Sequence, residues 1–297
     1  MKSYKNPIIL NSPKGNTSDP YVIRHGEYYY HCYSNSEGIF ISKSKTLWDI
    51  ENGEIKKVYD CTASNSLPHW YAPELHLIQN KWYIYAAPDY GNDLHVMTVL
   101  ECSDKSPMGE YKNLGMIRGL ENKWTIDATV LNYQSELYLV WTTCAEIFIS
   151  KMADPQTITG KITGLTKPTY EFETRAGFIN EGPAVLYRGD KIHVVYSANN
   201  SMNDEYCLGL LTFKKGGDIL DIQNWEKSKN AVFEKTEDIF GPGHCSFTTV
   251  EENGKEIDYI VYHANLESGS GWNGRSVFIK PFSWDENDAP VFGSTEF

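Results

Sequence analysis

Five residues that can exchange protons open five short apolar segments of the chain, at intervals of roughly 55 residues. In chain order they are Asp19, Glu74, Asp127, Glu181 and His244. Apolar neighbours raise the pKa of a carboxyl group, which keeps a proton donor loaded near neutral pH. Glu181 has such neighbours, in a run fixed by Gly182 and Pro183. The pattern indicates acid–base chemistry carried out by carboxyl groups.

Each interval contains the same succession of expected strands. An apolar run, a polar turn and an aromatic-rich run follow the opening residue, which predicts a hairpin. Third strands are expected at residues 39–43, 94–97, 147–151, 207–211 and 276–280, and the first and third of these read identically as Ile-Phe-Ile-Ser-Lys. Fourth strands are expected near residues 55–58, 115–117, 167–170, 231–233 and 290–292.

These repeats predict an all-β protein, a five-bladed β-propeller that forms one catalytic domain over residues 1–297. The alternative is an array of two-sheet sandwiches, which the even spacing disfavours. The innermost strand of each propeller blade lines the central axis, so the five opening residues should converge at one face. Converging carboxylates repel and lose hydration, at a cost of several kcal/mol per ion unless partners compensate. A purely structural propeller has no reason to carry them.

The composition limits the partners that the protein can bind. The chain has 297 residues, of which 41% are hydrophobic, and a formal net charge of -12. Phosphate binding needs a basic face, so the charge argues against nucleic acids and anionic membranes and fits a neutral substrate. The chain starts without a signal-peptide core and has no apolar run of membrane-spanning length, so we expect a cytoplasmic protein. Its six cysteines lack paired spacing and are expected to be free thiols.

Separated carboxyl groups without a nucleophilic serine or cysteine are typical of glycoside hydrolysis. One carboxylic acid protonates the leaving oxygen while a second carboxylate activates water, and inverting enzymes hold the two about 6.5–9.5 Å apart. Aromatic faces pack against the C–H surface of a sugar ring. Trp70, Tyr71 and Trp124 stand close enough to the opening residues to do so. The expected partner is therefore an oligosaccharide or a polysaccharide.

Three of the opening segments, taken together, resemble the catalytic set of glycoside hydrolase family 43. They are Asp19-Pro20, Ile126-Asp127-Ala128 and Asn180-Glu181-Gly182-Pro183. The resemblance implies a five-bladed inverting enzyme in which Asp19 is the general base, Glu181 the general acid, and Asp127 tunes and orients the acid. No cofactor is then required for the chemistry. Residues 206–212 and 241–244 resemble the branch of exo-acting α-1,5-L-arabinofuranosidases, which implies release of L-arabinofuranose.

The resemblance also implies further site residues. Arg275 matches an arginine that reaches the pocket, and His244 matches a histidine that often helps to hold a calcium ion. Trp70, Tyr71, Glu74, Arg275 and His244 are therefore the expected substrate-binding residues, and His244 is the expected metal ligand. For Glu74, the alternative is a structural role in which it holds backbone amides or Arg275.

Two departures from the family pattern affect substrate preference. Tyr71 occupies the place of the usual tryptophan before Ala-Pro-Glu-Leu, and Cys245 replaces the asparagine that usually follows His244 in the branch. A β-1,4-xylosidase or an endo-arabinanase on the same scaffold is therefore an alternative. A non-catalytic, carbohydrate-binding propeller is an alternative from a different functional class.

Overall fold

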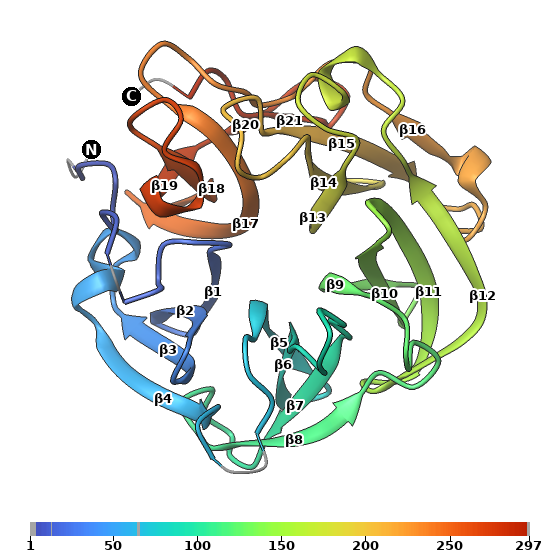
Figure 1. Cartoon of the computed structure of the whole chain (residues 1–297). Helices are drawn as coiled ribbons and strands as arrows, with labels where there is room; N and C mark the ends of the chain where they lie inside the picture. The colour runs from blue at the N-terminus through green and yellow to red at the C-terminus, as the bar shows by residue number, and fades with distance from the viewer. Residues whose placement is uncertain (1–3, 13, 64–65, 296–297) are drawn as a thin grey trace.

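The repeated hairpins form five antiparallel sheets arranged as blades around a central axis (Figure 1). A computed structural model describes residues 4–12, 14–63 and 66–295. The blade strands are β1 (Tyr21–His25), β2 (Tyr28–Asn35), β3 (Gly38–Ser44) and β4 (Glu54–Asp60) in blade one; β5 (Tyr71–Ile78), β6 (Lys81–Ala87), β7 (Thr98–Cys102) and β8 (Tyr111–Met116) in blade two; β9 (Ile126–Tyr133), β10 (Glu136–Thr143), β11 (Glu146–Asp154) and β12 (Thr157–Thr166) in blade three; β13 (Asn180–Arg188), β14 (Lys191–Ala198), β15 (Cys207–Lys214) and β16 (Trp225–Lys227) in blade four; and β17 (Phe240–Glu252), β18 (Lys255–Asn265) and β19 (Arg275–Pro281) in blade five. The prediction of a five-bladed propeller is confirmed, and the sandwich alternative is wrong.

Short elements connect and complete the blades. They are the 3-10 turns η1 (Leu47–Asn52), η2 (Glu171–Glu173), η3 (Ile222–Asn224) and η4 (Gly271–Gly274), and the small hairpin of β20 (Ser283–Trp284) and β21 (Pro290–Val291). No helix within the described ranges has the length and apolar character needed to cross a membrane. All six cysteines are free, as predicted, and only Cys144 is exposed.

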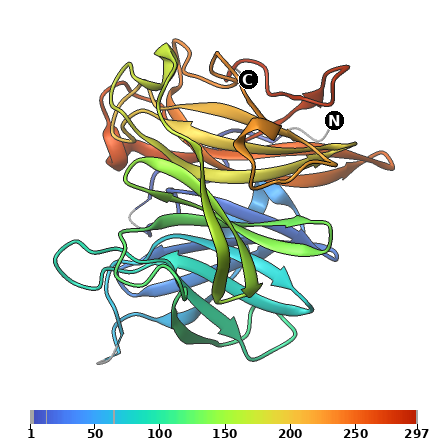
Figure 2. The same cartoon turned by 90° about the vertical axis from the view of Figure 1, so that its right-hand side faces the viewer.

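The N-terminal segment closes the ring by pairing with the last blade. Ile9 forms an antiparallel bridge with Val277 of β19, and the Val277 N–H donates to the Ile9 carbonyl at 2.8 Å. The segment thus adds to the outer edge of blade five, where the sequence predicted a strand at residues 290–292. In Figure 2 the marks for both chain ends lie in the upper part of the view, near the strands of the last blades.

Hydrophobic packing between neighbouring blades holds the ring together. Successive strand residues point to opposite faces, so each blade contributes one apolar face to each of two interfaces. Between blades one and two, Ile41 packs with Trp82 and Ile84, and between blades five and one Val22 packs with Val261. Each fully buried side chain of this size contributes about 1.5–3 kcal/mol. Because this packing between the blades stabilises the ring, the side chains at the central axis can be polar.

A two-residue bulge interrupts the innermost strand near its start in blades two to five. Its first residue has a positive φ, and Asp19 has the same conformation just before β1. The five residues are Asp19 (φ 49°), Ala72 (φ 43°), Asp127 (φ 56°), Gly182 (φ 56°) and His244 (φ 38°). A left-handed conformation costs a residue other than glycine about 1–3 kcal/mol, and it persists where the surrounding packing fixes it. We call these five positions the bulge residues.

Several outer strands lie elsewhere than expected. The third strand of blade two is β7, whereas His95, within the expected range 94–97, forms only an isolated bridge. The fourth strands of blades three and four are β12 and β16, which precede the expected ranges 167–170 and 231–233. Outer strands have one neighbour and a solvated edge, so the alternation that reveals a strand is weak in them.

Candidate active site

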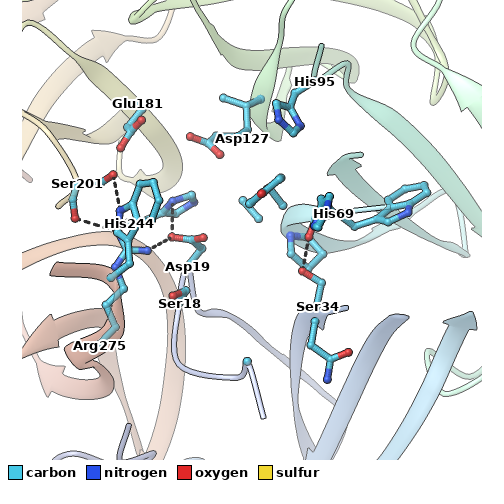
Figure 3. Close-up of a pocket in the computed structure, with 18 of the residues that line it drawn as sticks. Ser18, Asp19, Ser34, His69, His95, Asp127, Glu181, Ser201, His244 and Arg275 are labelled. Atoms are coloured by element: carbon cyan, nitrogen blue, oxygen red, sulfur yellow. Dashed lines mark hydrogen bonds and ion pairs between the residues drawn. The ribbon is translucent and has the colours of Figure 1, made fainter. Parts of the chain in front are cut away.

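A pocket of about 560 Å³ opens at the end of the axis where the innermost strands begin. Asp19, Asp127, Glu181, His244 and Arg275 all line it. Figure 3 shows the three acidic side chains entering the pocket from different blades. The convergence expected from the repeat is thus present for the four opening residues of blades one, three, four and five.

Asp19 is surrounded by positive and hydrogen-bonding groups. Its Oδ1 lies 3.1 Å from His244 Nδ1 and 3.3 Å from a guanidinium nitrogen of Arg275. Its backbone N–H donates to Nδ1 of His263 at 3.1 Å. Burial alone would raise the pKa of Asp19, but the charges of His244 and Arg275 outweigh it and hold that pKa well below its usual range. Asp19 is therefore a carboxylate at neutral pH.

Glu181 has the opposite electrostatic balance. Burial raises its pKa, the nearby charge of Asp19 raises it further, and a hydrogen bond from Tyr206 together with the charges of His244 and Arg275 opposes the rise only in part. The Tyr206 hydroxyl donates to Oε1 of Glu181 at 2.8 Å. The pocket therefore holds one carboxyl group that favours ionisation and one that favours its proton.

Asp127 contacts the backbone beside Glu181. Its Oδ2 accepts the N–H of Gly182 at 3.1 Å, which fixes the peptide that carries the Glu181 side chain. Burial raises the pKa of Asp127, and Glu181 and Asp19 add to the rise against the lowering effect of His244. A Cβ on Gly182 would lie 3.0 Å from the His244 ring, and φ is positive there, so glycine is required at this position.

The two histidines near Asp19 have opposite charge states. Burial opposes the charging of His244, but Asp19 and Asp127 raise its pKa to about 9, so it is an imidazolium at neutral pH. His263 is buried and beside Arg275, and both effects push its pKa well below the ordinary value. Neutral His263 accepts from the backbone of Asp19, whereas charged His244 pairs with its carboxylate.

Arg275 is held from two sides. One guanidinium nitrogen contacts Asp19, and another donates to the Ser201 carbonyl at 3.1 Å. The Trp272 indole N–H donates to the Ser201 hydroxyl at 3.1 Å while the ring remains 56% exposed at the pocket. The expected arginine is therefore in the pocket, and Trp272 is a lining residue that the sequence analysis missed.

An aromatic wall faces the acidic residues. Tyr71 and Trp124 are 44% and 37% exposed, and His95 packs edge-on between them with ring centroids 4.9 Å and 6.3 Å away. The ring of Trp70 turns into the core instead, where it packs against Tyr59 and donates to the Leu67 carbonyl at 2.7 Å. Trp70 thus borders the pocket but stacks in the core, and Tyr71 and Trp124 supply the exposed faces.

A family model for glycosyl hydrolases family 43 matches residues 4–290. The chain belongs to this family. Its fold, its pocket and the three segments quoted from the sequence all agree with that membership.

Several relatives of this family-43 chain are named as arabinofuranosidases. Extracellular exo-α-(1→5)-L-arabinofuranosidases of Streptomyces avermitilis and Streptomyces chartreusis are each 33% identical to it, over 93% and 88% of this chain and 61% and 82% of theirs. The chain therefore spans about three-fifths of the Streptomyces avermitilis enzyme. The crystal structure of an α-L-arabinofuranosidase from Lactobacillus brevis is 33% identical and superposes with a TM-score of 0.88, covering 99% of this chain and 97% of the other.

The expectation of a cytoplasmic protein is contradicted. Both Streptomyces relatives are named extracellular enzymes. The first residues of a sequence do not by themselves decide where a protein works, and the expectation depended on them.

Glu74 does not reach the pocket. Its side chain is buried, and its Oε2 lies 2.8 Å from Nε2 of His76. The bulge residue of blade two is Ala72, so Glu74 comes two residues later and lies further along the axis, next to Tyr21. Glu74 is therefore absent from the described pocket lining, because it lies two residues beyond the equivalent position of the repeat. The partner of Glu74 is His76, whereas the structural alternative named backbone amides or Arg275.

The surroundings of His244 do not fit a calcium ion. Calcium prefers several oxygen ligands, and a protonated imidazole has no free lone pair to offer. His244 is an imidazolium paired with Asp19, and Asp19 is shared with Arg275. Within the part of the chain that the structure describes, no three His, Cys, Asp or Glu side chains are grouped so as to hold a metal.

Proposed function

We propose that this family-43 hydrolase releases L-arabinofuranose from α-1,5-linked arabinan or arabino-oligosaccharides with inversion of configuration. The observation that carries the proposal is the pair of carboxyl groups with opposed pKa shifts in one pocket, Asp19 lowered and Glu181 raised. Environments that push two carboxyl pKa values apart assign one group as base and the other as acid. The named activities of relatives 33% identical to this chain support the choice of sugar.

In the proposed reaction, Asp19 is the general base and Glu181 is the general acid. Asp19 takes a proton from a water molecule as the water oxygen forms a bond to the anomeric carbon. Glu181 gives its proton to the glycosidic oxygen as the bond between that oxygen and the anomeric carbon breaks. An α-linked substrate then yields β-L-arabinofuranose, and solvent returns the proton from Asp19 to Glu181.

Three further residues would support these two groups. Ionised Asp127 and ionised Glu181 repel each other, so each disfavours ionisation of the other, and the bond from Asp127 to Gly182 fixes the backbone at the acid. His244 and Arg275 keep the general base ionised. Their positive charges lie beside Asp19 and disfavour its protonated form.

The substrate ring would lie between the acidic residues and the aromatic wall. Tyr71 and Trp124 offer exposed faces to the sugar C–H surface, and Arg275 offers N–H donors to its hydroxyl groups. We propose that the whole chain 1–297 acts as one catalytic unit and that its partner is an oligosaccharide or a polysaccharide.

The first test is a product assay on linear α-1,5-arabino-oligosaccharides beside xylo-oligosaccharides, with proton NMR following the anomer released. Arabinose with the β configuration supports the proposal, whereas xylose would overturn the choice of sugar and an α product would overturn inversion. The same assay with and without a chelator tests the metal ligand predicted at His244. Because protein side chains supply both proton transfers, we expect unchanged turnover in the chelator.

The Glu181→Gln variant tests the general acid. Its turnover on oligosaccharides should fall by about 100-fold or more, because acid catalysis contributes roughly 10²–10⁴-fold. On 4-nitrophenyl α-L-arabinofuranoside, whose leaving group needs little protonation, the loss should be much smaller. Asp19→Asn should lose activity on both substrates, since every leaving group needs the attacking water. Equal losses of Glu181→Gln on the two substrates would refute the assignment.

A further inference from the structure

Tyr206 reaches the catalytic acid from outside the innermost strands. It precedes β15, is only 1% exposed, and its hydroxyl donates to Oε1 of Glu181 at 2.8 Å. Its ring stacks on His263 with centroids 5.8 Å apart and an interplanar angle of 5°. His263 in turn accepts the backbone N–H of Asp19. One buried pair of rings therefore spans the distance between the acid and the base.

Gly243 makes room for this tyrosine. A Cβ at Gly243 would lie 2.2 Å from the Tyr206 ring, closer than any real contact. Gly243 precedes the bulge residue of blade five just as Glu181 precedes that of blade four. At the position that Glu181 occupies in blade four, blade five has Gly243, which has no side chain, and the Tyr206 ring fills the space. The second glycine of the Gly-Pro-Gly-His segment is therefore needed because a larger residue would collide with Tyr206.

The hydrogen bonds around Tyr206 have a fixed direction. The His244 backbone N–H can only donate, and it donates to the Ser197 hydroxyl oxygen at 2.8 Å. The hydroxyl proton of Ser197 is then free to donate to the Tyr206 oxygen, with which Ser197 also interacts. Tyr206 therefore donates its own proton onward to Glu181. Ser197 and Tyr206 thus each donate one hydrogen bond and accept one.

We propose that Tyr206 is a positioning residue that assigns the acidic proton of Glu181 to Oε2. Because Oε1 accepts from Tyr206, the proton of the neutral acid is held on the other oxygen. This inference rests on the proposed role of Glu181 as the acid and adds the means by which its proton is aimed at the glycosidic oxygen. Without the hydroxyl, the proton can occupy either oxygen, and only one of them is productive.

The charged groups around Glu181 do not depend on the Tyr206 hydroxyl. Asp19 and Asp127 oppose its ionisation, whereas His244 and Arg275 favour it. All four remain in a Tyr206→Phe variant, and the ring still fills the space at Gly243. A change in the titration of Glu181 in this variant would therefore report the lost hydrogen bond.

The test compares Tyr206→Phe with Tyr196→Phe as a matched control. The Tyr196 hydroxyl also donates to a glutamate, Oε1 of Glu173, at 2.9 Å and lies in the same sheet away from the pocket. In Tyr206→Phe, kcat on arabino-oligosaccharides should fall by about 10-fold or more with KM little changed, and the loss on the 4-nitrophenyl arabinoside should be several-fold smaller. Tyr196→Phe should leave both values unchanged.

The pH dependence gives a second readout. The Tyr206 bond lowers the pKa of Glu181, so its removal should move the alkaline limb of kcat/KM to higher pH by about one to two units. Equal losses on the two substrates, or an unmoved alkaline limb, would overturn the proposal.

An NMR titration of the Glu181 carboxyl carbon, assigned with Glu181→Gln, measures the same shift without turnover. If the wild-type protein cleaves no arabinoside, the proposed function fails, and the NMR shift still decides the role of Tyr206.

Discussion

Replacing Arg275 with methionine should move the acidic limb of the pH–activity profile. The guanidinium nitrogen lies 3.3 Å from Oδ1 of Asp19, and the side chains are 7% and 21% exposed. Unit charges at this distance interact by about 5 kcal/mol at an effective dielectric constant of ~20, or roughly three to four pKa units. Single neighbouring charges shift measured carboxyl pKa values by about 1–3 units. Because His244 remains, we expect the pKa of Asp19 to rise by about two units.

The direction of the shift follows from the role of Asp19. A general base works only when ionised, so activity falls as the pH drops through its pKa. The wild-type pKa lies well below the usual range, and the acidic limb of the variant should therefore appear at a pH about two units higher. Removing one partner of a buried ion pair should also lower the free energy of unfolding by about 3–5 kcal/mol.

The measurement is kcat/KM across acidic to neutral pH, at a temperature at which urea unfolding shows the variant to be folded. The matched control is Arg24→Met, since Arg24 pairs with Glu256 at 3.1 Å outside the pocket. Its acidic limb should match that of the wild type. An unmoved acidic limb in a folded Arg275→Met protein, or the same shift in the control, would refute the electrostatic argument.

Two further substitutions test the remaining parts of the pocket. Asp127→Asn removes a carboxyl group that repels ionised Glu181, so the alkaline limb of kcat/KM should move to lower pH by about one unit. This shift is opposite in sign to that of Tyr206→Phe. A shift to higher pH would contradict the proposed effect of Asp127 on the pKa of Glu181. Trp272→Ala removes an exposed ring held by Ser201, so KM for arabino-oligosaccharides should rise by about 3–10-fold at unchanged kcat in initial-rate measurements. A fall in kcat alone would show that Trp272 does not act by binding substrate.

The repeat predicted the propeller and the convergence of Asp19, Asp127 and Glu181 on one pocket. Asp19, Asp127 and Glu181 could be found from the sequence because each lies at or beside the bulge of an innermost strand, and such strands have strong apolar patterns. Glu74 was misplaced because the sequence does not reveal where the chain bulges. A shift of two residues leaves the side chain on the same face but moves it further along the axis.

Residues that support Glu181 and Asp19 from outside the innermost strands could not be predicted in this way. Tyr206 precedes β15 and His263 lies on β18, and only the packing of the blades brings them to Glu181 and Asp19. The one available signal was Gly243, a glycine where other blades carry a side chain. The predicted ranges of several outer strands were also wrong, because the solvated edge of such a strand weakens the alternation of apolar and polar residues.

A residue with positive φ recurs at the start of the innermost strand in all five blades, with a different side chain from blade to blade. Among the five bulge residues, Asp19, Asp127 and His244 carry charge, whereas Ala72 and Gly182 carry almost no volume. Blade two, with alanine there, contributes His69, Trp70, Tyr71, Ala72 and Pro73 to the pocket wall. If the blades began as identical copies, replacing the bulge residue of one blade with a small residue would open space for a ligand on that side of the axis. The pocket therefore owes its asymmetry to the side chains at the bulge residues and not to the backbone, and new specificities would follow from exchanging small and titratable residues among the blades.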